Sequence, residues 1–157
     1  HFIGHLQRNK VKYLASFVGL IHGVESFRLL KEINKQAKKN DRTIDVLLQF
    51  FIANEETKFG LSFEEAKTML QSDEFKSLDN VCIRGVMGMA TFTDEKEQIK
   101  REFSGLKKIH QELSTDFFNE QTNFDVISMG MSGDYKIAIE EGSTMIRLGS
   151  SIFGKRD

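Results

Sequence analysis

Short apolar segments alternate with longer amphipathic segments along the whole chain, and this alternation limits the possible folds more than any single motif. Six apolar runs are predicted to be strands, and they cover residues 2–6, 17–22, 44–53, 81–90, 124–130 and 145–149. Several of these runs are almost continuously hydrophobic, which is typical of a parallel sheet covered on both faces. The repeated βα order therefore predicts an α/β fold, in a single domain over residues 1–157.

The segments between the predicted strands show the period of amphipathic helices. Ser62 and Glu65 have the spacing of a capping box at the start of one helix. Asp94 is the expected N-cap of a longer helix of about five turns. A shorter helix is predicted over residues 134–141 and should end at Gly142.

An open doubly wound sheet and a closed barrel both satisfy this alternation. A (β/α)8 barrel needs eight βα units, and the shortest examples run to about 200 residues. Six units in 157 residues are two units short, and the chain begins at His1 inside a strand-like run without an initiating Met. We therefore expect a barrel whose first two βα units are absent from this chain, so that these residues form its last six units.

The charge balance argues against a phosphate polymer as a partner. The chain carries 22 Lys and Arg against 23 Asp and Glu, so no overall field points to nucleic acid or to a membrane surface. No apolar stretch reaches the roughly 18 residues that a membrane span needs. The single cysteine, Cys82, excludes a disulfide within the chain and is expected to be a small buried hydrophobe. We expect a cytoplasmic protein.

Small residues follow the last two predicted strands, in the sequences MGMSGD and RLGSS. In a βα barrel a phosphate site commonly forms from the loops after the seventh and eighth strands. Backbone N–H groups at Gly130, Ser132, Gly149 and Ser150, with the two hydroxyls, have the chemistry to bind a phosphate dianion. The alternative is that these residues form ordinary tight turns and helix caps.

Arg147 is the one charge in an otherwise apolar strand, and a buried guanidinium must find a partner. The partner is either a carboxylate within the barrel or a ligand at its mouth. His1 and His5 have an even spacing on the first predicted strand, but no third ligand is evident, so we expect no metal site. The motifs GxSxG, GxGxxG and the P-loop are missing, which argues against acyl transfer, dinucleotide binding and NTP hydrolysis.

Four segments together resemble the successive motifs of the pyridoxal phosphate homeostasis proteins, the YggS or PROSC type: HFIGHLQRNK, NEETKFG, RGVMGMA and SMGMSGDYKIAIEEGSTMIRLGSSIFGKRD. The resemblance implies a TIM-type (β/α)8 barrel like the N-terminal domain of alanine racemase, with pyridoxal 5'-phosphate (PLP) held as a Schiff base with a lysine. It also implies that Ser132, with Gly149 and Ser150, binds the cofactor phosphate and that Arg147 faces the pyridine nitrogen. Members of the family regulate or carry vitamin B6 without established catalysis.

The chain departs from the family pattern at the Schiff-base lysine. The lysine belongs to a motif resembling VSKTK, which is missing here, so the lysine is expected upstream of His1. Ser150 stands where Thr is usual and keeps the hydroxyl. Lys10, Lys12 and Lys58 are expected to be solvated rather than to serve as substitutes.

We therefore expect a non-catalytic PLP-binding protein of vitamin B6 homeostasis, whose partners include apo forms of PLP enzymes. One alternative is a PLP-dependent amino-acid racemase. Racemization needs a second base, and the chain offers only Tyr13 and Tyr135 as tyrosines. The other alternative is a phosphate-binding scaffold that never uses an aldehyde.

Overall fold

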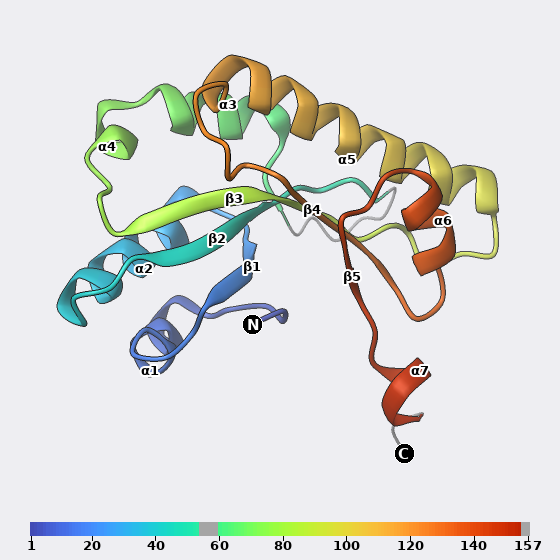
Figure 1. Ribbon diagram of the computed structural model, residues 1–157, viewed down its shortest axis with the longest axis horizontal. Helices are drawn as coiled ribbons and strands as arrows, with labels where there is room; N and C mark the ends of the chain where they lie inside the picture. The colour runs from blue at the N-terminus through green and yellow to red at the C-terminus, as the bar shows by residue number, and fades with distance from the viewer. Residues whose placement is uncertain (54–59, 155–157) are drawn as a thin grey trace.

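The computed structural model describes residues 1–53 and 60–154, and these form one curved parallel sheet flanked by helices (Figure 1). The sheet has the order β1-β2-β3-β4-β5, with every pair parallel. The strands are β1 (Leu20–Val24), β2 (Ile44–Gln49), β3 (Val81–Met87), β4 (Val126–Met131) and β5 (Met145–Arg147). The helices are η1 (Arg8–Lys10), α1 (Val11–Leu14), α2 (Phe27–Lys39), α3 (Phe63–Gln71), α4 (Asp73–Lys76), α5 (Lys96–Phe117), α6 (Tyr135–Glu140) and α7 (Ser150–Phe153).

The first predicted strand, over residues 2–6, is wrong. Only Phe2 pairs with the sheet, through a single parallel bridge to Ile21. Its N–H donates to the Leu20 carbonyl, and its own carbonyl accepts from the His22 N–H. From Ile3 the chain leaves the sheet: residues 3–5 are exposed, and Leu6 packs into the main core without pairing with a strand. The described residues therefore form a five-stranded half-barrel rather than six βα units.

The helix starts follow the predicted caps in one case and not in another. Ser62 and Glu65 form the complete capping box in front of α3, an arrangement worth about 1 kcal/mol. Helix α5 begins at Lys96, and its N-cap is Glu95 rather than Asp94. Glu95 makes no side-chain cap bond among the described residues. The apolar face of α5 secures this helix, since it buries Ile99, Phe103, Leu106 and Leu113.

The two faces of the sheet bury different sets of side chains. On the outer face, alternate strand residues pack with α2, α3, α5 and α6 in the main core (Figure 1). On the inner face, Leu20, Leu47 and Met87 form a second cluster with Val126 and Met145, and no helix residue belongs to it. Leu47 is nevertheless 0% exposed. The sheet therefore curves around its own inner side chains, as one half of a barrel wall does.

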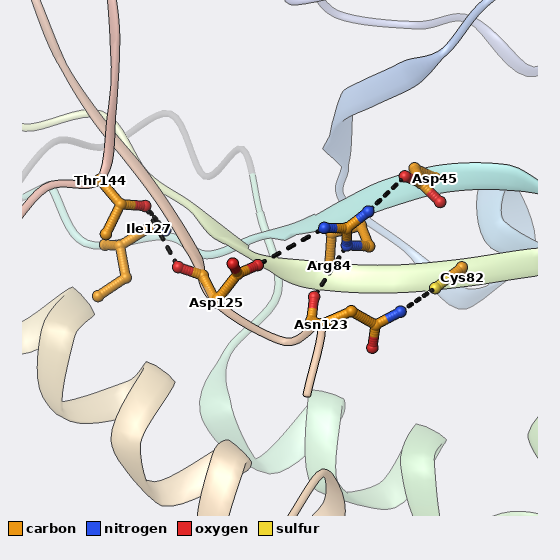
Figure 2. Close-up of polar contacts among 7 residues, drawn as sticks. All are labelled: Asp45, Cys82, Arg84, Asn123, Asp125, Ile127 and Thr144. Atoms are coloured by element: carbon orange, nitrogen blue, oxygen red, sulfur yellow. Dashed lines mark hydrogen bonds and ion pairs between the residues drawn. The ribbon is translucent and has the colours of Figure 1, made fainter. Parts of the chain in front are cut away.

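A polar cluster fixes the amino ends of the inner face (Figure 2). Arg84 in β3 pairs with Asp45 in β2 at 2.8 Å and lies 3.7 Å from Asp125, which precedes β4. Its Nε also donates to the Asn123 carbonyl at 2.8 Å. Cys82, predicted to be buried, is half-buried, and the Asn123 amide lies 3.3 Å from its sulfur. This cluster ties β2, β3 and the entry to β4 together at the end of the barrel opposite the predicted site.

Candidate functional site at the carboxyl ends of the strands

Arg147 lies on the inner face of the sheet and not in the outer helical layer. Strand residues alternate between faces, so Arg147 lies on the same face as Met145, two residues before it. Ser128 of β4 is the strand partner of Met145. Its Nη1 donates to Ser128 Oγ at 2.8 Å, and its Nη2 donates to the Gly88 carbonyl at 3.1 Å. The described residues place no carboxylate within ion-pair distance of this guanidinium. The structural ion pair considered as one alternative is therefore not observed among them.

Burial lowers the pKa of Arg147, but the guanidinium keeps its charge at neutral pH. Loss of hydration lowers the pKa of Arg147 to about 10, and the Asp134 carboxylate partly offsets this effect. A guanidinium with this pKa remains a cation at pH 7. It offers N–H groups to an acceptor and is not a source of protons.

Two buried polar residues beside Arg147 were not singled out from the sequence. Ser128 is 0% exposed and His22, on β1, is 1% exposed. His22 Nδ1 lies 3.1 Å from Ser128 Oγ, and His22 Nε2 lies 3.3 Å from Nδ1 of His1. Burial, followed by the charge of Arg147, lowers the pKa of His22 to about 4. The imidazole is therefore neutral at pH 7.

A sequence signal for these two residues existed. Each is the only polar side chain within a run of apolar strand residues, as Arg147 is, and a buried polar group must be hydrogen-bonded.

Ser132 lies where the two small-residue loops meet. Its hydroxyl oxygen accepts from the backbone N–H of Gly149 at 3.3 Å and from that of Ser151 at 3.3 Å. Ser150, between them, is the first residue of α7, where backbone N–H groups have no partner within the helix. The structure thus brings the predicted residues Ser132, Gly149 and Ser150 together and adds Ser151. We call these four residues the cradle.

The cradle opens beside a hollow of about 720 Å³. Ser132 and Ser151 line it together with three lysines, Lys96, Lys100 and Lys136. Asp134 fixes the loop after β4, because its Oδ1 accepts from the Met131 N–H at 2.6 Å. The lining also carries two carboxylates, Asp134 and Glu140, so an approaching anion meets three cationic and two anionic side chains, a small excess of positive charge.

Close packing against α6 requires glycine at position 130. Its φ is +97°, and a Cβ there would lie 2.6 Å from the Cβ of Ala138 in α6. The residue is therefore small because α6 packs closely on β4. The contact of its backbone N–H with a phosphate remains a prediction.

The remaining candidates lie elsewhere. His5 contacts Glu25 at 3.3 Å, whereas His1 contacts His22, so the two histidines do not converge. Among residues 1–53 and 60–154, no group of three His, Cys, Asp or Glu is arranged to hold a metal ion. Lys10 and Lys12 are exposed and lie over the ring of Tyr13. Lys58 lies outside the described residues.

The donors at this edge of the sheet fit a phosphorylated pyridine. A phosphate needs several N–H and hydroxyl donors, and the cradle presents them on adjacent loops. A pyridine nitrogen is an acceptor, and Arg147 uses only two of its five N–H groups on protein acceptors in the described part of the chain. The chain therefore carries complementary groups for the two polar ends of such a molecule.

The sequence matches the family model for the alanine racemase N-terminal domain over residues 2–157. This chain belongs to the alanine racemase N-terminal domain family.

Curated relatives of this family member carry the name pyridoxal phosphate homeostasis protein, which confirms the resemblance predicted from the motifs. The relative from Aquifex aeolicus is 38% identical over 156 residues, which are 99% of this chain and 66% of the relative. The relative from Haemophilus influenzae is 34% identical over 157 residues, which are 100% of this chain and 65% of the relative. The chain thus spans slightly less than two thirds of the length of these relatives.

A solved structure of the same fold is that of PipY from Synechococcus elongatus with PLP bound. It is 28% identical to this chain, with a TM-score of 0.82, and the match covers 96% of this chain and 68% of PipY. The likeness shows that the half-barrel described here has the fold of the corresponding part of PipY. In the part of the chain that the structure describes, no helix is both long enough and apolar enough to cross a membrane.

Proposed function

We propose that this protein binds PLP at the carboxyl ends of β4 and β5 and serves vitamin B6 homeostasis. One observation carries the proposal: the cradle and the charged guanidinium of Arg147 lie next to each other at the carboxyl ends of β4 and β5. Ser132, Gly149 and Ser150 bind the phosphate, and Arg147 donates a hydrogen bond to the pyridine nitrogen. The PLP bound to PipY supports the same ligand here.

The whole protein is proposed to close a (β/α)8 barrel around this site. About a third of the length of each relative lies outside the region that it shares with this chain, which leaves room for two further βα units. We place the Schiff-base lysine in those units, ahead of His1. PLP supplies an aldehyde that a lysine amine captures reversibly, and this chain supplies the groups that hold the rest of the molecule.

The site favours holding PLP over catalysing its reactions. Arg147 stays charged and donates without giving up a proton, so a bound pyridine nitrogen remains unprotonated and withdraws electrons weakly. We therefore propose a carrier in the cytoplasm that delivers PLP to apo enzymes, rather than a racemase.

The binding proposal is tested by titrating the whole protein with PLP and with pyridoxal, which lacks the phosphate, and following the absorbance of the bound chromophore. Ser132→Ala is expected to weaken PLP binding about tenfold, because a hydrogen bond to a charged group contributes about 1.5 kcal/mol or more. Its affinity for pyridoxal should not change. Ser77→Ala, an exposed serine at the end of α4, is the matched control. A whole protein without cofactor absorbance in excess PLP contradicts the proposal.

The non-catalytic part has its own test. Exchange of the α-proton of alanine is measured by NMR in deuterated water with the PLP-loaded whole protein. We expect no exchange above that of free PLP. Sustained turnover would instead support the racemase alternative.

A further inference from the structure

We propose that Ser128 and His22 are positioning residues for Arg147: a directed chain of hydrogen bonds through them sets the guanidinium toward the ring nitrogen of the bound cofactor. The inference rests on the proposed function and adds two residues to it. Neither of the two is expected to touch PLP. Their role is to fix the orientation of the group that does.

Arg147 needs such support because of where it lies. It ends β5, a strand of only three residues, and an arginine side chain has many rotamers. The guanidinium is held from two neighbouring segments: Ser128 of β4 accepts from Nη1, and the Gly88 carbonyl, just after β3, accepts from Nη2. Two contacts on different nitrogens fix the plane of the guanidinium as well as its position.

The direction of the hydrogen bonds follows from counting protons. Ser128 carries one hydroxyl proton, and its oxygen already accepts from Arg147, which has no acceptor to offer in return. A serine oxygen can accept twice, but a buried O–H also needs an acceptor, and in the described part of the chain the neighbour that can accept is Nδ1 of His22 at 3.1 Å. We therefore assign the hydroxyl proton to that contact. That assignment requires a neutral His22 with its proton on Nε2, which faces Nδ1 of His1 at 3.3 Å.

Burial makes this chain of bonds directional. His22 and Ser128 are shielded from water, and an imidazolium beside the Arg147 charge is disfavoured. Without the Ser128 hydroxyl, Nη1 of Arg147 and Nδ1 of His22 would both lose their partner, and the guanidinium would keep only the Gly88 carbonyl. It would then rotate more freely about its remaining bond.

The test compares two probes that differ at one atom: PLP and 1-deaza-PLP, in which the ring nitrogen is replaced by C–H. Wild-type whole protein is expected to bind PLP about tenfold more tightly than the deaza analogue, because only PLP accepts from Arg147. Ser128→Ala is expected to reduce this preference to about twofold or less and to leave binding of the analogue unchanged. Ser143→Ala is the control: Ser143 is half-buried, its hydroxyl bonds only backbone carbonyls among the described residues, and its variant should keep the full preference.

The possible results distinguish a failure of the proposed PLP binding from a failure of the positioning role of Ser128. A wild-type protein that does not bind PLP overturns the proposed function. A wild-type preference that survives in Ser128→Ala overturns the positioning role alone. Equal weakening of both probes in Ser128→Ala means that the serine only supports the fold, and this also overturns the inference.

A cofactor-independent measurement completes the test. In ¹⁵N spectra of the protein without PLP, we expect His22 in the Nε2–H form and a slowly exchanging Arg147 N–H signal. His22→Leu removes the acceptor for Ser128 and should abolish that slow exchange. His22→Asn places a carbonyl oxygen near the position of Nδ1 and should restore it. An Arg147 signal that is the same in all three proteins contradicts the relay.

Discussion

Lowering the pH from 7 to 4.5 is expected to cost the native state about 2 kcal/mol through His22 alone. Burial, then the charge of Arg147, then the amino terminus of the chain, lower the pKa of this imidazole to about 4. The same group in an unfolded chain ionises near 6.5. As the pH falls, the unfolded chain therefore takes up a proton before the native state does. The stability contributed by neutral His22 is present above about pH 6.5 and is lost as the pH falls toward 4.

The assay is urea denaturation at both pH values for three proteins: wild type, His22→Asn and His5→Gln. The free energy of unfolding should fall by about 2 kcal/mol more in the wild type than in His22→Asn, since one pKa unit corresponds to about 1.4 kcal/mol. His5 is exposed, so His5→Gln should behave as the wild type does. Burial also lowers the pKa of His110, but this effect is common to all three proteins. Equal losses in the wild type and in His22→Asn would refute the argument.

Three further substitutions test the fold that positions the site. Gly130→Ala should destabilise the protein by about 2 kcal/mol or more, since φ is +97° and the new Cβ meets Ala138, whereas Gly133→Ala has open space and should be near neutral in the same melts. Phe103→Ala should cost about 3 to 5 kcal/mol in chemical denaturation, because this ring is 0% exposed in the main core. Glu65→Ala should cost about 1 kcal/mol through the capping box, and an unchanged midpoint would contradict that role.

The apolar runs in the sequence predict the positions of the five strands well. All five strands overlap predicted runs, because buried parallel strands leave a continuous hydrophobic signal. The run over residues 2–6 carries the same signal, yet only Phe2 reaches a partner strand. Whether an apolar run pairs with a neighbouring strand depends on the tertiary structure and cannot be predicted from the run itself.

The candidate site divides in the same way. The sequence singles out Ser132, Gly149 and Arg147, because short motifs of small residues and one lone charge mark the ends of the last two strands. Ser128 and His22 join Arg147 across 19 and 125 positions of sequence, respectively, counted from the residue numbers, and their convergence depends on strand register. Single polar residues inside strands were the available signal, but only the sheet order shows that they meet.

The cradle has a consequence for how quickly a ligand is accepted. The Ser132 oxygen already draws in the N–H groups of Gly149 and Ser151, so the two loops are arranged around an electronegative atom before any anion arrives. Both contacts are long, at 3.3 Å, and a phosphate oxygen can replace or share them at small cost. The entropy of ordering these loops is therefore lost during folding rather than during capture, which suits the proposed carrier role, in which PLP is both taken up and released.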